Sequence, residues 1–224
     1  MPTYTIDSGN TFIKVAKFEN NILSKITRYT PEDFNPTFQK DEKIIFSNVS
    51  KNIIHKLPSS AIAAAGLIED FKSTYDQSTF GVDRKIISHY LQKKFPNENI
   101  LIIDAGSFIT FDYIESGIHR GGPIYLGLGN YLKAYPAFSQ NLPLVDNVKA
   151  GECANTKEAI STAFTQYLSM IKNEIQKFQT DQVIVTGGDA RNFQDCADEQ
   201  GDLMHHALFE LSRDFDSSVL LPIT

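Results

Sequence analysis

The sequence predicts an α/β protein whose two similar halves face a central cleft, and three observations support this fold class. Apolar strand patterns alternate with segments of helical periodicity along the 224 residues. An apolar strand that ends in Asp-x-Gly occurs near the N-terminus and again near the middle of the chain. No long linker or low-complexity tract separates the two copies. We therefore expect two α/β halves, formed by residues 1–95 and 96–224.

In the first half, four strands and one helix are expected. The strand patterns cover residues 3–6, 12–18, 22–29 and 43–49. Asn20-Asn21 is typical of a hairpin turn between the second and third of these strands. Apolar residues at helical spacing predict a helix over residues 82–95, whereas residues 50–80 have no clear pattern.

In the second half, strands and helices are expected to alternate. Strands are predicted over residues 100–103, 182–185 and 218–221, and helices over residues 128–137, 192–199 and 203–215. The clearest helix runs to Ile175 and begins with a capping box, with Asn155 or Thr156 as N-cap and Glu158 near N3. Its apolar face fits either core packing or subunit contact.

The composition indicates a folded, acidic protein. Hydrophobic residues make up 42% of the chain and aromatic residues 11%, which argues against disorder. A formal net charge of −6 without a Lys/Arg-rich run argues against nucleic acid as a partner. The longest apolar stretch, residues 61–68, is far shorter than the roughly 20 residues that cross a bilayer, so no membrane association is expected. The lack of a basic N-terminal segment and of CxxC spacing predicts a cytoplasmic protein with reduced thiols.

The repeated Asp-x-Gly strand is the most informative feature. Residues 4–10 (YTIDSGN) resemble residues 101–107 (LIIDAGS), and the two aspartates, Asp7 and Asp104, lie 104 − 7 = 97 positions apart. In both copies a second strand and a hairpin turn follow. We expect each half to point one such strand–turn–strand unit into the cleft.

These turns are typical of phosphate binding. A glycine after the strand lets backbone N–H groups approach a ligand, and small polar residues beside it add donors to phosphate oxygens. The candidates are Gly9, Asn10, Thr11, Gly106, Ser107 and Thr110. Asp7 and Asp104 are predicted to clamp a Mg²⁺–triphosphate, because the cation screens the repulsion between phosphates and carboxylates. The late turn Gly187-Gly188 offers backbone against which a nucleoside can lie.

Phosphoryl transfer to an alcohol also needs a carboxylate that orients the hydroxyl group and accepts its proton. Asp83, which follows Gly81 at the start of a predicted helix, is the best candidate. The helix N-terminus and Arg84 would keep Asp83 ionised, and Arg84 can form a bidentate pair with a substrate carboxylate. The alternative interpretation is an N-cap Asp beside a solvated Arg.

Six segments in order resemble the motifs of the type III pantothenate kinases. Residues 7–14 (DSGNTFIK) are similar to the first phosphate motif, residues 81–84 (GVDR) to the Gly-x-Asp-Arg motif, and residues 104–112 (DAGSFITFD) to the second phosphate motif. The other three are Gly121-Gly122-Pro123-Ile124, residues 155–160 and Thr186-Gly187-Gly188. The combination is far more specific than any one motif.

The resemblance implies a two-domain, actin-like (ribonuclease-H-like) kinase, a homodimeric transferase that uses ATP, Mg²⁺ and a monovalent cation, K⁺ or NH₄⁺. Its reaction makes 4′-phosphopantothenate from pantothenate, the first step of coenzyme A biosynthesis. The resemblance assigns Asp83 as the general base. It assigns pantothenate binding to Gly81, Arg84 and Thr156, with Thr156 offered across the subunit interface.

The resemblance also implies the nucleotide and metal sites. Asp7 and Asp104 would serve the divalent metal and the phosphates, with Lys14 as a further residue of the first phosphate motif. Asp112 lies where the monovalent cation is expected. Gly187-Gly188 would contact the nucleotide.

Departures from the family pattern, including a missing Asn-Pro before residues 81–84 and a somewhat short chain, leave other functions open. Ser107-Phe108 stands where the family usually has Thr-Ala, Leu126-Gly127 where it has Pro-Gly, and Ala163 where it has Gly. One alternative is a kinase of the same superfamily that acts on another small acid or sugar. The other is a catalytically silent relative kept as a regulatory subunit, against which the retention of all three presumed carboxylates argues.

Overall fold

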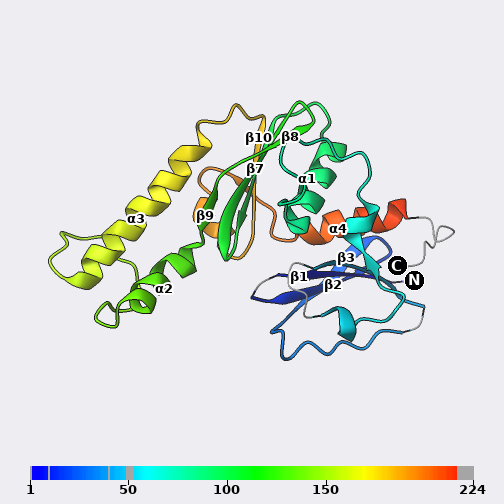
Figure 1. Ribbon diagram of the computed structural model, residues 1–224, viewed down its shortest axis with the longest axis horizontal. Coiled ribbons are helices and arrows are strands. Elements are labelled where there is room, and N and C mark those ends of the chain that lie inside the picture. The colour runs from blue at the N-terminus through cyan, green and yellow to red at the C-terminus, as the bar shows by residue number, and fades with distance from the viewer. Residues whose placement is uncertain (1, 10, 40, 49–52, 216–224) are drawn as a thin grey trace. The chain divides into compact units, whose positions relative to one another are not determined.

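The computed structural model describes residues 2–9, 11–39, 41–48 and 53–215. These residues form two compact units, one of residues 2–96 and 202–215 and one of residues 97–201. Each unit has its own β-sheet and its own helices (Figure 1). Asn10 and the predicted strand over residues 218–221 lie outside the described residues.

The first unit is built on a five-stranded sheet with the order β3-β2-β1-β4-β5. The strands are β1 (Thr3–Ser8), β2 (Ile13–Glu19), β3 (Ile22–Tyr29), β4 (Lys43–Asn48) and β5 (Ile62–Ala63). The Asp-x-Gly strand β1 pairs antiparallel with β2 and parallel with β4. At the hairpin turn, Asn20 and Asn21 adopt φ of 52° and 66°, the left-handed conformation that asparagine tolerates well. The turn predicted from these two residues is confirmed.

The two faces of this sheet are covered differently. On one face, Ile6, Ile13, Ile44 and Phe34 belong to an apolar cluster. On the other face lie α1 (Val82–Lys94) and α4 (Leu203–Asp214), which contact each other and β4. The short 3-10 helices η1 (Ile54–Lys56) and η2 (Ala64–Leu67) lie within residues 50–80, the segment without a clear sequence pattern.

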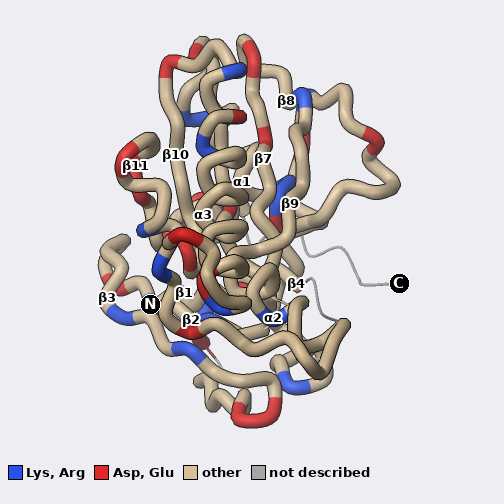
Figure 2. The backbone as a smooth tube through the Cα atoms, turned by 90° about the vertical axis from the view of Figure 1, so that its left-hand side faces the viewer, with Lys and Arg blue, Asp and Glu red and all other residues tan. Residues whose placement is uncertain are grey.

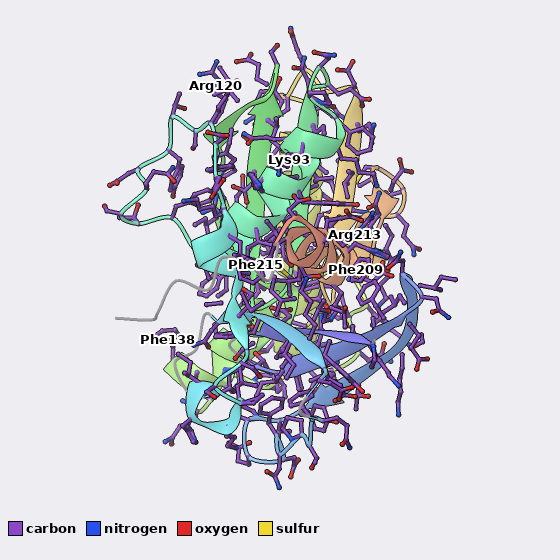
Figure 3. All side chains as sticks on the ribbon, turned by 90° about the vertical axis from the view of Figure 1, so that its right-hand side faces the viewer. Lys93, Arg120, Phe138, Phe209, Arg213 and Phe215 are labelled. Carbon is purple, nitrogen blue, oxygen red and sulfur yellow. The ribbon has the colours of Figure 1, made fainter. Side chains whose placement is uncertain are left out.

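Helix α4 belongs to the first unit, so the predicted assignment of residues 203–215 to the second half is wrong. The reason is long-range packing. Phe209 of α4 stacks on Phe18 of β2 with ring centroids 4.1 Å apart, and Lys93 of α1 binds Asp214 at 3.0 Å. Figure 3 labels Phe209 and Lys93 on these two helices.

The second unit has a six-stranded sheet, in which five strands follow the order β11-β10-β6-β7-β8 and β9 pairs with β7 beside this path. The strands are β6 (Ile100–Ala105), β7 (Phe108–Glu115), β8 (Ile118–Gly121), β9 (Ile124–Leu126), β10 (Gln182–Thr186) and β11 (Asp198–Glu199). The helices are α2 (Leu128–Phe138), α3 (Thr156–Ile175) and the 3-10 helix η3 (Ala190–Phe193). Leu101, Ile103 and Phe111 pack in one core with Ile171 and Ile175 of α3.

The prediction of a helix over residues 192–199 is wrong, because the 3-10 helix η3 and the short strand β11 form there. Ile184 and Val185 of β10 pair in parallel with Asp198 and Glu199, and this pairing draws the segment into the sheet. Residue 200 continues it, since its N–H donates to the carbonyl of Val185 at 2.8 Å.

Both units repeat one strand arrangement. The central strand, β1 or β6, pairs antiparallel with the next strand of its hairpin, β2 or β7, and parallel with a later strand, β4 or β10. The predicted fold class, two similar actin-like α/β halves, is confirmed. In the described part of the chain, no helix is long and apolar enough to cross a membrane. Figure 2 shows Lys and Arg dispersed among Asp and Glu along the chain.

Candidate active site

The first Asp-x-Gly turn closes the β1–β2 hairpin. Asp7 lies on β1 directly between Lys14 of β2 and Ser47 of β4 in the strand register. The N–H of Gly9 donates to the carbonyl of Phe12 at 3.1 Å and holds the turn shut. Thr11, on the β2 side of this turn, is exposed. Ser8, at the end of β1, is buried, so Thr11 is the described polar side chain of this turn that lies at the surface.

Asp7 is a partly buried carboxyl with an unusual proton affinity. Burial is the main cause that raises its pKa to about 6, with Lys14 lowering the pKa and the charge of Asp83 raising it by smaller amounts. Asp7 and Asp83 therefore lie close enough to interact. A cation bound beside Asp7 would favour the ionised carboxylate.

Asp83 is fixed at the start of α1 by its neighbours. Gly81 is the N-cap residue, and Asp83 Oδ1 accepts the N–H of Arg84 at 2.9 Å. A Cβ on Gly81 would lie 2.6 Å from Asp83 Oδ1, so glycine leaves the room that the carboxylate occupies. Asp83 lies inside the first helical turn, where the helix dipole favours a negative charge.

Arg84 is a buried residue with 9% of its surface exposed. Its guanidinium carbon lies 5.2 Å from the ring centroids of both Tyr75 and Phe80. Two aromatic faces thus hold the cation in place. The alternative interpretation of this motif, an N-cap Asp beside a solvated Arg, is wrong on both points.

The second Asp-x-Gly turn is enclosed by backbone of its own unit. The N–H of Gly106 donates to the carbonyl of Phe108 at 2.9 Å. The carbonyl of Ser107 accepts the N–H of Gly127 at 3.0 Å and Nδ2 of Asn130 at 2.8 Å, which ties the turn to the start of α2. A Cβ on Gly127 would meet the carbonyl oxygen of Gly106 at 2.1 Å, so glycine is required there.

The Gly187-Gly188 turn lies against the carboxylate of Asp104, the aspartate of the second Asp-x-Gly turn. Gly187 has φ of 96°, and a Cβ there would meet the carbonyl oxygen of Ala105 at 2.4 Å and Asp104 Oδ1 at 2.6 Å. A Cβ on Gly188 would meet nothing within 4 Å. The two glycines therefore differ: Gly187 is needed for close backbone approach, whereas Gly188 leaves a gap beside the turn.

The structure brings Asp104 together with Thr110 and Thr186, its direct neighbours on β7 and β10. The Thr110 hydroxyl is buried without a hydrogen-bond partner among the described residues. Asp112 lies opposite Ile102, two residues farther along β7. There it is buried, and its Oδ1 lies 2.7 Å from Nε2 of His119.

Thr156 is the exposed first residue of α3. Asn155 is the N-cap, and its side chain accepts the N–H of Glu158 at 3.0 Å. Glu158 in turn accepts the N–H of Ala154 at 3.1 Å, so the predicted capping function is confirmed with Asn155 in the N-cap position. The cap leaves the side chain of Thr156 at the surface.

Sequence reasoning missed Asp189 and Ser47. Asp189 follows the Gly187-Gly188 turn, and its N–H donates to the carbonyl of Ala105 at 2.9 Å. Burial raises the pKa of Asp189, although Arg191 and the N–H of Gly129 oppose that rise. The adjacent Gly-Gly turn could have directed attention to Asp189, but Ser47 follows no motif and is found only through strand pairing.

Comparison with known proteins identifies the family. A family model described as "Type III pantothenate kinase" matches residues 4–177. This chain belongs to the type III pantothenate kinase family. The family resemblance drawn from the motifs is therefore confirmed.

Type III pantothenate kinases from two bacteria are among the most similar relatives. The protein from Christiangramia forsetii is 32% identical, and the match covers 83% of this chain and 86% of the relative. The protein from Flavobacterium psychrophilum is 26% identical with the same two coverages.

A solved structure has the same fold. A conserved Campylobacter jejuni protein, described as a Baf family transcriptional activator, matches with a TM-score of 0.70 and 24% identity. The match covers 94% of this chain and 98% of that one.

Proposed function

We propose that the protein transfers the γ-phosphoryl group of ATP to the hydroxyl group of pantothenate and makes 4′-phosphopantothenate, the first step of coenzyme A biosynthesis. Family membership supports this pair of substrates. The observation that carries the chemistry is the start of α1, where Gly81 leaves room for the Asp83 carboxylate and Arg84 is buried between two aromatic rings. The same unit also holds Asp7.

Asp83 is the proposed general base. Its first-turn position and the N–H of Arg84 favour the carboxylate form, which can accept the proton of an attacking hydroxyl group. Arg84 is the proposed partner of the pantothenate carboxylate, because its guanidinium is already held in place and little freedom is lost on binding. Gly81 and Thr156 complete the proposed pantothenate site.

The two Asp-x-Gly turns are the proposed nucleotide site. Gly9, Asn10, Thr11, Lys14, Gly106, Ser107, Thr110, Gly187 and Gly188 are the residues proposed for ATP. Asp7 and Asp104 would hold Mg²⁺, which when bound neutralises charge on the triphosphate. Among the described residues no three His, Cys, Asp or Glu side chains form a metal-holding group. One or two carboxylates, together with phosphate oxygens and water, are the usual ligands of Mg²⁺ in such sites.

The assembly and its environment complete the proposal. We propose a cytoplasmic homodimer in which Thr156 serves the active site of the partner subunit. The exposure of Thr156 at the start of α3 supports this role. K⁺ or NH₄⁺ is the proposed monovalent cation, with Asp112 as its candidate carboxylate.

A direct assay tests the reaction. Purified protein with ATP, Mg²⁺ and K⁺ should phosphorylate pantothenate, and ³¹P NMR should identify the product. The same protein should not phosphorylate the other hydroxy-acids and sugars of a test panel. Replacement of K⁺ by Na⁺ should lower the rate. Phosphorylation of another acceptor would point to a different kinase of the superfamily. Nucleotide or pantothenate binding in calorimetry without any product would point to a regulatory relative.

A further inference from the structure

Ser47 is a buried residue beside Asp7 that the motifs do not include. It lies on β4, and the parallel register places it directly next to Asp7 of β1. Directly paired residues of neighbouring strands present their side chains on the same face of a sheet. Ser47 therefore shares the face of Asp7, on the helix-covered side of the first sheet.

The Ser47 hydroxyl has no hydrogen-bond partner among the described residues, although only 1% of the residue is exposed. A buried hydroxyl without a partner costs free energy, and native proteins usually satisfy such groups with protein or bound water. Thr5, the neighbouring polar residue on this face, is satisfied because its Oγ1 lies 2.8 Å from Nδ1 of His205. The Ser47 hydroxyl group therefore retains hydrogen-bonding capacity for a ligand or a bound water beside Asp7.

The second unit contains a counterpart of Ser47. Asp104 has Thr186 beside it on the parallel strand β10, as Asp7 has Ser47 on the parallel strand β4. Thr186 opens the Gly187-Gly188 turn that packs against the Asp104 carboxylate. The repeated topology therefore places a hydroxyl residue on the parallel-paired side of the aspartate in each Asp-x-Gly strand.

The charges around the Ser47 hydroxyl group indicate which ligand it can bind. Asp7 adjoins Ser47, Asp83 lies near Asp7, and Lys14 lies on the opposite side of Asp7. An anion next to two carboxylates is repelled, so a phosphate oxygen is a poor occupant. A water molecule can donate one hydrogen to the carboxylate and one to the Ser47 hydroxyl oxygen.

We propose that Ser47 is a positioning residue for the divalent cation that accompanies ATP, and that its hydroxyl group and Asp7 together hold one water of the hydrated cation. This inference rests on the proposed nucleotide site. It is independent of which acceptor the enzyme phosphorylates. The water-mediated contact would orient the cation without direct coordination by Ser47.

Calorimetric titration of a non-hydrolysable ATP analogue, with Mg²⁺ and with EDTA, tests this role. Ser47→Ala should weaken the binding of the Mg²⁺ complex by about 10-fold or more, as is usual for residues that orient the ligands of a metal without coordinating it. Binding of the metal-free analogue should stay unchanged. Ser47→Thr, which keeps the hydroxyl group on a β-branched side chain, should retain most of the affinity. Ser47→Cys, which nearly keeps the volume but bonds weakly to water, should behave like Ser47→Ala.

Ser88→Ala is the matched control. Ser88 on α1 is also fully buried, and its hydroxyl also lacks a partner among the described residues, but it is not paired with Asp7. Its replacement should leave Mg²⁺-analogue affinity unchanged. Equal losses in both variants, equal losses with and without Mg²⁺, or wild-type affinity of Ser47→Ala would each overturn the inference. A wild-type protein that binds no nucleotide would overturn the proposed nucleotide site as well.

Discussion

Asp83 occupies the space that a side chain on Gly81 would need: a Cβ at residue 81 would lie 2.6 Å from Asp83 Oδ1. The contact involves the end of a side chain and not backbone, so the carboxylate can rotate away from the Arg84 N–H without disturbing the helix. We therefore predict that Gly81→Ala lowers kcat by about 10-fold or more, within the usual scale for a displaced general base, while the melting temperature changes little. Steady-state kinetics and thermal unfolding of the same preparation measure both effects. A large loss of stability would contradict this view of the contact.

Removal of the negative charge of Asp83 should lower kcat more than its displacement does. Asp83→Asn keeps the shape of the side chain but cannot accept a proton, so kcat should fall by roughly 10²-fold or more. ATP affinity should stay close to that of the wild type, because Asp83 is assigned to the acceptor. Rapid-quench kinetics together with nucleotide titration check both statements. Near-wild-type turnover would remove Asp83 from the mechanism.

The Gly187-Gly188 turn provides a matched pair of substitutions. Gly187→Ala forces a left-handed backbone onto alanine and drives its Cβ into the backbone of Ala105, so it should destabilise the protein by about 2 kcal/mol or more. Gly188→Ala meets nothing within 4 Å and should be nearly neutral. Urea unfolding distinguishes them. Equal stability of the two variants would show that the approach of Gly187 to Asp104 is relaxed in solution.

Asp7 should make the stability of the ligand-free protein depend on pH. Its pKa is raised to about 6 in the folded state, so folding favours the protonated carboxyl. Stability from this group is present below the unfolded-state pKa and is lost as pH rises through about 6. At pH 7.5, Asp7→Asn should therefore have a free energy of unfolding ~2 kcal/mol higher than that of the wild type, measured by urea unfolding. At pH 4 the two proteins should differ little. A less stable Asp7→Asn protein at pH 7.5 would contradict the predicted burial cost.

Mixed dimers should reveal whether Thr156 acts across the subunit interface. Asp83→Asn and Thr156→Ala subunits would each have impaired sites alone, but a mixed dimer would contain one site with both wild-type residues. Random mixing makes half of the dimers mixed, so about a quarter of the sites should recover. Activity measured before and after subunit exchange gives the result. No recovery, or a sedimenting monomer with full activity, would place Thr156 outside the partner's site.

Local patterns predicted the parts of the fold that local forces decide. The Asn20-Asn21 turn and the Asn155 cap depend on neighbours in sequence, and both are seen in the structure. Parallel pairing and helix docking join distant segments, so the place of Ser47 beside Asp7 and of Phe209 on Phe18 could not be predicted. Asp83 was found by its motif, but the burial of Arg84 between two rings depends on Tyr75, in a segment without periodicity.

Helix α4 makes the first unit discontinuous in the chain. The second unit, residues 97–201, is an insertion between α1 and the last helix of the first. During synthesis the ribosome therefore finishes the second unit before it supplies α4, and until then the sheet around Phe18 lacks the helix that carries Phe209. A chain stopped near residue 200 would be left with an incomplete first core and an apolar sheet face open to aggregation or chaperones.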